Sequence, residues 1–352
     1  MSKLIIFCAS LLASMGWSFA GAAVDASEEA HTTEHHEHDI GSVIVHHLLD
    51  DYQWHFFSYG GFHATIYLPI IVYHEGQGLK IFSSRYLYHS PTHSYRGIVL
   101  SHDRLTAEDG ARLWDFSISK VVAGLFLTAL LLFVMFRAIA RTYSKRWTPK
   151  GLQGFMEPII LFVRDDIAVP SMGKVHAARF TPLLLNFFFF IWFANLLGLL
   201  PWGLNITGNI AVTGALALLA LLIINFNGTK DYWTHIFWTP GVPWWLKVPL
   251  PIMPLVEVLG IFTKPFALMI RLFANITAGH VLILSVVSLI FIMAKLHVAV
   301  GFGTSLFSIA LGLFLFGLEL LVAILQAYIF TILVAVFLGM ALETHEHHEK
   351  SH

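Results

Sequence analysis

Long uncharged stretches alternate with short charged segments over the second two thirds of this chain. The run from Val121 to Phe136 is uncharged and is flanked by Lys120 and Arg137. The fifty residues from Phe180 to Thr229 contain no Asp, Glu, Lys, Arg or His. A helix needs about 20 apolar residues to cross a bilayer. The pattern therefore predicts an all-α polytopic membrane protein.

The spacing of these stretches predicts about five membrane helices. Fifty residues are too many for one span, and the segment 201–208, Pro-Trp-Gly-Leu-Asn-Ile-Thr-Gly, breaks this stretch into two. The expected membrane segments are 121–136 with its interfacial ends, 180–200, 209–227, 249–291 and 303–342.

The last two segments are unusually long. At about 1.5 Å per residue each is about 60 Å long as a helix, twice a bilayer core of about 30 Å. Either these helices break or they lie strongly tilted. We favour two long tilted helices that form an antiparallel hairpin.

Basic residues set the expected orientation. Five of them follow the first span, which makes that end cytoplasmic by the positive-inside rule: Arg137, Arg141, Lys145, Arg146 and Lys150. Thr148-Pro149 then predicts a helix start, and the segment to about Asp166 mixes apolar and charged residues. We expect it to be a surface helix on the cytoplasmic face. The polar tail, residues 344–352, is cytoplasmic by the same count.

The N-terminus has the pattern of a signal peptide, residues 1–22. Lys3 precedes an apolar run, and Ala20-Gly21-Ala22 has the small-residue pattern of a cleavage site. A retained signal anchor is one alternative. A lipoprotein anchor on Cys8 is another, although the large Phe7 before it argues against that signal.

Residues 23–116 are expected to be exported. The histidine-rich part up to residue 40 is typical of a disordered tail, with metal binding as a weaker alternative. Further on, the β-branched and aromatic runs 63–73 and 79–82 are separated by Glu75-Gly-Gln-Gly78, which predicts a β-hairpin. Residues 96–100 could add a strand. Nothing in this small β-containing region looks catalytic.

Composition agrees with a membrane protein. The chain is 57% hydrophobic and 12% charged, against about 25% charged residues in soluble domains. Its single cysteine excludes an intramolecular disulfide and a cysteine-based metal site. No basic patch suggests a nucleic-acid partner, and no motif calls for a cofactor.

Arg271 is the residue that stands out. It is the only Asp, Glu, Lys or Arg between Phe266 and Ala294. A charge at bilayer depth costs about 2.5–3.5 kcal/mol on insertion scales, so a partner or a water path has to compensate it. The alternative is an arginine that snorkels to the interface. Because Arg271 lies well inside its apolar run, we favour an ion or substrate pathway.

Other polar residues lie at helical spacings around Arg271. Asn275 shares its face, Glu257 lies about 21 Å back along the axis, and His280 lies about 13.5 Å ahead but on the opposite face. In the last segment, Glu319 and Gln326 share a face about 10.5 Å apart. If the helices are antiparallel with Gln326 beside Arg271, Glu319 falls near the level of His280.

These spacings favour one polar site divided between two helices, with Arg271 facing a partner and the His280–Glu319 pair facing a water path. Two alternatives remain open. Gln326 alone is equally explained by a helix–helix hydrogen bond. His280 and Glu319 alone are explained by a structural buried pair.

At this point the sequence resembles subunit a of the F-type ATP synthase, in its bacterial form, over residues 115–343. The resemblance rests on several motifs in order: Asn195-Leu-Leu-Gly-Leu-Leu-Pro201, Asn209-Ile-Ala-Val-Thr213, Lys264-Pro265, Arg271-Leu-Phe-Ala-Asn275 with Ala278-Gly279, and Leu325-Gln-Ala-Tyr-Ile-Phe330. Some bacterial members carry glutamate where His280 stands and histidine where Glu319 stands. No counterpart is assigned before about residue 100.

The resemblance implies the membrane stator of the proton channel in the F0 sector, within a membrane domain of residues 117–343. Arg271 would be the family's essential arginine, which acts on a carboxylate of the c-subunit ring, with Asn275 and Gln326 beside it. His280 and Glu319 would line the periplasmic half-channel, and Glu257 would belong to the cytoplasmic one.

Such a chain is no enzyme alone, has no cofactor or metal, and lies in the bacterial inner membrane. Its implied partners are the c-ring, the b subunits of the peripheral stalk and the remaining F0F1 subunits, besides the lipid bilayer. Three rival functions are a secondary transporter, a proton-pumping respiratory subunit and a receptor with an exported ligand-binding region. Inverted repeats would mark the first, and we find none.

Overall fold

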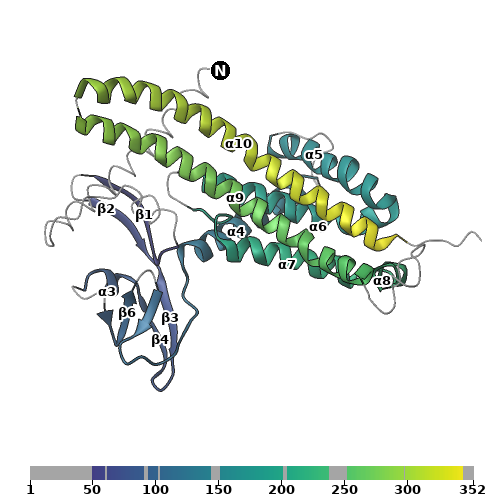
Figure 1. Ribbon diagram of the computed structural model, residues 1–352, viewed down its shortest axis with the longest axis horizontal. Helices are drawn as coiled ribbons and strands as arrows, with labels where there is room; N and C mark the ends of the chain where they lie inside the picture. Colours follow the sequence, from purple (N-terminus) through teal and green to yellow (C-terminus); the bar gives the residue numbers. More distant parts are fainter. Residues whose placement is uncertain are drawn as a thin grey trace, which may run out of the picture. The chain divides into compact units, whose positions relative to one another are not determined.

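The computed structural model describes residues 50–59, 62–90, 94–101, 104–143, 151–200, 204–237, 252–296 and 298–343. The expected signal peptide, histidine-rich tail, Thr148-Pro149 helix start and C-terminal tail lie outside these residues. A small β region, residues 50–116, is followed by long helices (Figure 1). This confirms the expected all-α membrane architecture with a small β-containing N-terminal region.

The described residues divide into two compact units, and each is treated by itself below. Unit 1 comprises those within Met1–Thr128, Ala194–Asn209 and Ile276–Leu321. Unit 2 comprises those within Ala129–Phe193, Ile210–Asn275 and Val322–His352.

The β region in unit 1 contains three small antiparallel sheets, with strand orders β1-β2, β4-β3-β8 and β5-β6-β7. Their bounds are β1 Gln53–Tyr59, β2 Phe62–Tyr67, β3 Pro69–His74, β4 Gly78–Ser83, β5 Ser94–Tyr95, β6 Ile98–Ser101, β7 Arg104–Ala107 and β8 Leu113–Asp115, with the short helix α3 at Arg85–Tyr88. The expected hairpin is β3–β4, in which Val72 pairs with Lys80.

Two features of the sequence build this hairpin. Along β3, every second side chain is buried, and Ile70 and Val72 pack with Phe82, Leu87 and Ile98 into a small core. The turn contains Gly76 at φ +105° and Gly78 at φ +79°, conformations that glycine adopts without strain. The expectation of one strand over 63–73 is wrong. The structure has two strands there, β2 and β3, because the chain leaves one sheet at Leu68 and enters another.

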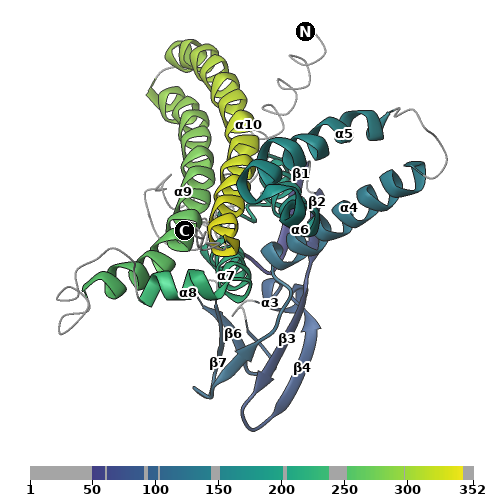
Figure 2. The same cartoon turned by 90° about the vertical axis from the view of Figure 1, so that its right-hand side faces the viewer.

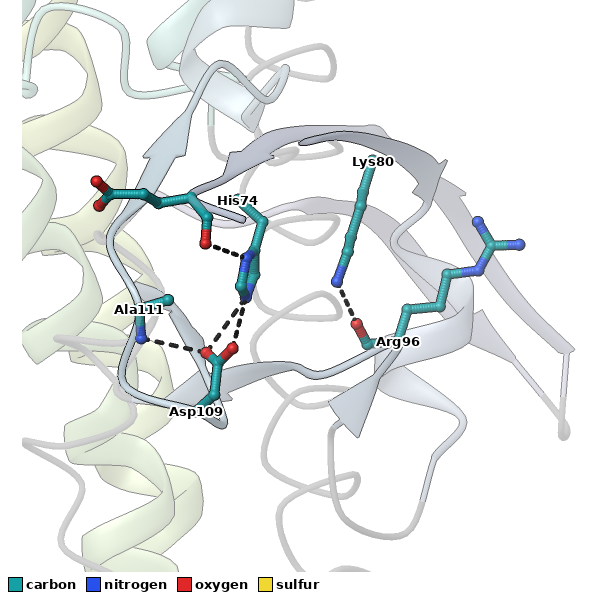
Figure 3. Close-up of polar contacts among 6 residues, drawn as sticks. His74, Lys80, Arg96, Asp109 and Ala111 are labelled. Carbon is teal, nitrogen blue, oxygen red and sulfur yellow. Dashed lines mark hydrogen bonds and ion pairs between the residues drawn. The ribbon is translucent and has the colours of Figure 1, made fainter. Parts of the chain in front are cut away.

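A buried histidine lies beside the turn of this hairpin (Figure 3). The His74 side chain is 2% exposed, and its Nε2 lies 3.2 Å from each carboxylate oxygen of Asp109. The Asp109 carboxylate also accepts the backbone N–H of Ala111 at 3.1 Å, and this bond, followed by the charge and hydrogen bond of His74, lowers the pKa of Asp109. The pair therefore ties the 108–111 loop to the β3–β4 turn.

The helices follow the expected order. Their bounds are α4 Lys120–Tyr143, α5 Leu152–Phe162, the π-helix η2 Val163–Ala168, α6 Val169–Gly198, α7 Ile210–Phe226, α8 Lys230–Phe237, α9 Ile252–Leu296 and α10 Val298–Leu342. Within the described residues, four helices are long and apolar enough to span a membrane, or five if α7 and α8, bent by 103°, form one span. About five spans were predicted.

The segment expected as a surface helix runs through α5 and η2 and ends at Gly173, whose φ of 72° interrupts the helix before the apolar part of α6. In unit 2 it packs along α10. The ring of Phe162 lies 5.8 Å from that of Tyr328. Near the other end, a Cβ on Gly339 would lie 2.0 Å from the backbone oxygen of Ser171. The two segments thus run parallel in close contact.

Helices α9 and α10 are antiparallel neighbours, as predicted, and α10 begins two residues after α9 ends (Figures 1 and 2). In unit 1, Gly279 of α9 touches Glu319 of α10. In unit 2, the Lys264 ammonium lies 4.9 Å from the Phe337 ring centroid. The large core of unit 2 joins these helices to α6, where the rings of Phe187 and Phe330 are 5.4 Å apart.

Candidate functional site

Arg271 lies on an exposed face of α9 in unit 2. Leu268 and Leu272 turn a neighbouring face of the helix into the core, at 3% and 0% exposure. Phe266, 61% exposed, and Ile270 share the outer surface with Arg271. The guanidinium makes no hydrogen bond or ion pair with any residue that the structure describes. The chain therefore presents an uncompensated cation on a membrane helix.

Asn275 and Gln326 complete the expected group, and they differ in burial. Asn275 is exposed, one helical turn after Arg271, as their shared face predicts. Gln326 is 4% exposed on α10. The contact between Lys264 and Phe337 sets the register of the two antiparallel helices in this unit. Counting along both helices from it places Gln326 level with the turn that carries Arg271 and Asn275.

His280 and Glu319 form a buried pair in unit 1. Their exposures are 7% and 5%, and His280 Nδ1 lies 3.7 Å from Glu319 Oε1. This separation is beyond direct hydrogen-bond range. Neither carboxylate oxygen of Glu319 has a hydrogen-bond partner among the described residues. A buried carboxyl group without a partner is costly, so the pair needs water or a transferable proton to satisfy it.

Glycines give this pair its space. A Cβ on Gly279 would lie 2.7 Å from Glu319 Oε1. A Cβ on Gly198, at the end of α6, would lie 3.6 Å from His280 Nε2. Both positions therefore bring backbone next to ionisable side chains where a larger residue would fill the room.

Further buried polar side chains lie in the same unit, around the turn after α6. Thr207 donates to the Asn195 side chain at 2.7 Å, and both residues are 1% exposed. The buried side-chain oxygens of Asn205, Thr277 and Ser308 have no partner among the described residues. Unit 1 thus contains several polar groups beyond the pair that the sequence predicted.

Glu257 lines a cavity of about 260 Å³ in unit 2. Four further ionisable side chains that the sequence analysis did not select for a site, besides Tyr232, line the same cavity: Asp231 and His235 of α8, Lys264 of α9, and Glu343 after α10. Thr229, between α7 and α8, donates its N–H to the Ala341 oxygen at 2.9 Å and its hydroxyl to the Glu343 oxygen at 3.2 Å. These bonds join the connection between α7 and α8 to the end of α10.

Sequence reasoning missed these side chains for a physical reason. Asp231 and His235 lie on a short helix outside the long apolar runs, where charged residues are ordinary. Only the bend between α7 and α8 brings them to Glu257. Among the described residues, no group of three or more His, Cys, Asp or Glu side chains could hold a metal ion.

Comparison with known proteins decides the family. The ATP synthase A chain family model matches residues 122–339, which is more than half of the chain. The chain belongs to this family. A second model, a domain of unknown function (DUF8433), matches residues 43–117 and so covers the β region.

Curated relatives agree with the ATP synthase A chain family. ATP synthase subunit a 2 of Chlorobium luteolum is 35% identical over 333 residues, 92% of this chain and 82% of that protein. ATP synthase subunit a of Anaeromyxobacter dehalogenans is 37% identical over 342 residues, 92% and 78% respectively. That of Myxococcus xanthus is 42% identical over 241 residues, 67% and 76%. The longer two matches extend into the N-terminal region, for which the motifs gave no counterpart.

Family membership settles the broad function. The chain is a multi-pass membrane subunit of the proton-transporting ATP synthase and an ion-translocating component of its F0 channel. This excludes the secondary transporter, the respiratory subunit and the receptor. It leaves the roles of the individual residues as predictions.

Proposed function

We propose that this chain is the stator of the F0 channel, with two half-channels that meet the c-ring at different depths. Arg271 drives deprotonation of each arriving c-ring carboxylate between them. Proton flow through the two paths turns the ring and is coupled to ATP synthesis. The single observation that carries the proposal is Arg271, exposed on a long apolar helix and without an ion-pair partner among the described residues.

The surroundings of Arg271 support a protein partner rather than lipid. Phe266 and Ile270, which precede Arg271 on α9, are exposed, so the guanidinium has apolar side chains beside it. In lipid the charge would cost about 2.5–3.5 kcal/mol or more. A ring of helices that each carry a carboxylate removes this cost, because each acid in turn pairs with the guanidinium.

Chemistry favours arginine at this position. A cation within about 4–6 Å lowers the pKa of a carboxylate by about 1–3 units, which releases the proton toward the exit side. Arginine itself is not deprotonated in proteins, so it also separates the two paths. A lysine could lose its proton in a dry site and open a leak. Asn275, on the same helix face, and Gln326, at the same level of α10, would supply amide groups near Arg271 without being bonded to it in this structure.

The buried pair of His280 and Glu319 supports the periplasmic half-channel, through which protons would enter. His280 and Glu319 lie 3.7 Å apart, and Glu319 lacks hydrogen-bond partners within the described chain. An imidazole titrates near neutral pH and takes up or releases a proton with little driving force. The pair would pass protons from the periplasmic side to the ring.

The cavity around Glu257 supports the cytoplasmic half-channel, through which protons would leave. Its volume of about 260 Å³ holds several waters, and carboxylates from three elements face it: Asp231, Glu257 and Glu343. Such a hydrated acidic cavity would accept protons released beside Arg271 and pass them to the cytoplasm. In this scheme the chain lies in the inner membrane with its C-terminus cytoplasmic and its mature N-terminus periplasmic, beside the b subunits of the stalk.

Replacing Arg271 by alanine tests the proposal. The Arg271→Ala complex should assemble yet lose ATP-driven proton pumping and ATP synthesis to background. Arg137→Ala, which removes an arginine that lies over Phe133 of α4, is the matched control and should keep most activity. Both variants are assayed in inverted vesicles by dye quenching and ATP formation. Normal coupled synthesis by an assembled Arg271→Ala complex rules the mechanism out.

A further inference from the structure

The first described residues of the β region hold the beginning of α4. The backbone N–H of Lys120 donates to the Asp51 oxygen at 2.8 Å, and that of Val121 donates to Asp50 Oδ1 at 3.0 Å. The first turn of a helix leaves its N–H groups without helical partners. Here a segment about 70 positions earlier in the chain supplies two of them. The β region is therefore fixed to the membrane helix.

Four charged residues meet at this junction, and we call them the charged layer: Asp50, Asp51, Asp115 and Lys120. Asp51 Oδ1 accepts the N–H of Tyr52 at 2.7 Å and the Tyr88 hydroxyl. The Tyr52 hydroxyl donates to Asp115. Burial, and then the hydrogen bond to Asp115, raise the pKa of Tyr52, so its phenol remains a donor. With three carboxylates and one ammonium, the charged layer is net negative.

Small-residue contacts lead from the charged layer to the buried pair. Gly124 lies one turn after Lys120 on the same helix face, and a Cβ there would lie 3.0 Å from the Leu204 and Ile206 side chains. A Cβ on Gly198 would lie 3.4 Å from the Leu204 oxygen and 3.6 Å from His280 Nε2. The turn 204–206 thus connects α4 to the pair.

These contacts lead to the His280–Glu319 pair, whose polar groups need solvent. Glu319 is 5% exposed and has no hydrogen-bond partner for either oxygen among the described residues. Asn205 Oδ1, in the connecting turn, is likewise buried and unsatisfied within the described chain. Unsatisfied polar groups of this kind mark positions for water. Glu319 and Asn205 therefore mark two positions for water on the side of the pair that faces this turn.

We propose that the β region forms the outer mouth of the proton inlet, with the charged layer as its rim. This rests on the proposed function, which makes His280 and Glu319 the inlet pair. The net negative rim concentrates protons at the entrance through its field, as charged clefts do for small cations. The region that matches a domain of unknown function thereby gains a role in proton capture, apart from its hold on α4.

A double variant removes the charge and keeps the hydrogen bonds. Asp50 and Asp51 accept all four of their side-chain hydrogen bonds through Oδ1. Asparagine keeps an acceptor at that atom. The D50N/D51N complex is incorporated into vesicles without the soluble catalytic subunits, and passive proton uptake is driven by a potassium diffusion potential.

The expected result is a salt-dependent loss. At about 10 mM salt the Debye length is about 30 Å, and proton uptake by D50N/D51N should be about three-fold or more below that of wild type. At about 1 M salt the Debye length is about 3 Å, and the two proteins should take up protons equally. The control is E75Q/E108Q, which removes two exposed carboxylates at the far end of the β region and should behave as wild type at both salt concentrations.

Three outcomes overturn the proposal. They are equal uptake by D50N/D51N and wild type at low salt, an equal loss in E75Q/E108Q, and a loss that high salt does not reduce, which indicates a structural role. If D50N/D51N fails to assemble, the wild-type complex alone decides, because its uptake at fixed driving force must fall as salt rises.

This experiment is separable from the test of the proposed function. If Arg271→Ala keeps coupled synthesis, the stator mechanism fails whatever the salt dependence. If Arg271→Ala is inactive but D50N/D51N conducts normally at low salt, only the role of the β region fails.

Discussion

Gly279 and Gly198 decide which ionisable side chains fit at the buried pair. The absent Cβ of Gly279 leaves the space in which the Glu319 carboxylate ends, 3.7 Å from the imidazole of His280. Gly198 leaves comparable room beside the other ring nitrogen. Because backbone lines the pair on both sides, a carboxylate and an imidazole of similar reach can occupy either position. The geometry therefore predicts that the two residues can be exchanged.

We expect the exchange to be tolerated better than either single change. His280→Glu leaves two carboxyl groups side by side, and Glu319→His leaves two imidazoles, so each single variant should lose most proton-driven ATP synthesis. The double variant restores one acid and one base in contact, and contacting residues couple by about 0.5–3 kcal/mol. ATP synthesis in vesicles is measured for all four proteins. Losses that simply add in the double variant would show that the two residues act independently.

At the scale of elements, hydropathy was sufficient to predict the long helices. The segments expected at 249–291 and 303–342 are α9 and α10, since apolar stretches of that length with so few charges permit little else. The β region was predicted less well. Its hairpin β3–β4 follows from alternation and glycines, but β8 pairs with β3, about 40 residues earlier in the chain, and local patterns do not specify such a pairing.

Sequence patterns likewise predicted only some of the candidate site residues. Arg271, His280 and Glu319 were found because a charge within an apolar run is rare. Asp231 and Glu343 were missed because they are ordinary surface residues until α8 folds back to the end of α10. Their approach depends on tertiary contacts alone.

The packing of the α5–η2 segment on α10 gives a prediction for one element. A Cβ on Gly339 would lie 2.0 Å from the Ser171 oxygen and 2.9 Å from its carbonyl carbon, both backbone atoms that cannot rotate away. Gly339→Ala should therefore destabilise the subunit by about 1–3 kcal/mol, as overpacking does. Thermal unfolding of the purified subunit in detergent measures the effect.

Gly303→Ala is the matched control on the same helix. Nothing lies within 4 Å of a Cβ there, and alanine is the better helix former by about 1 kcal/mol, so stability should hold or rise. Equal unfolding temperatures for Gly339→Ala and wild type would contradict the close packing of the two segments.

At the scale of the molecule, two kinds of structure are joined in one chain. The family match over residues 122–339 is membrane helix, whereas the match over 43–117 is a compact β region with its own core of Ile70, Val72, Phe82, Leu87 and Ile98. Hydrogen bonds from Asp50 and Asp51 fix the β region to α4. The other end of the region depends on the contact between His74 and Asp109, so its two ends can be tested separately.

Acid should loosen that far end first. Because the folded-state pKa of Asp109 is lowered, by the Ala111 N–H bond and by His74, its contribution to stability is present above the unfolded value of about 3.9 and is lost as pH falls through the lower folded value.

Hydrogen exchange of the Glu75–Gln77 and Asp109–Ala111 amides measures this effect. It is followed in the intact subunit and in the Asp109→Asn variant at each pH. Wild type should be better protected at pH 5 and should lose that advantage below about pH 4. Glu108→Gln, which removes the adjacent exposed carboxylate, should follow wild type throughout. Protection that is equal in wild type and Asp109→Asn at pH 5 would show that the Asp109 charge does not hold the loop.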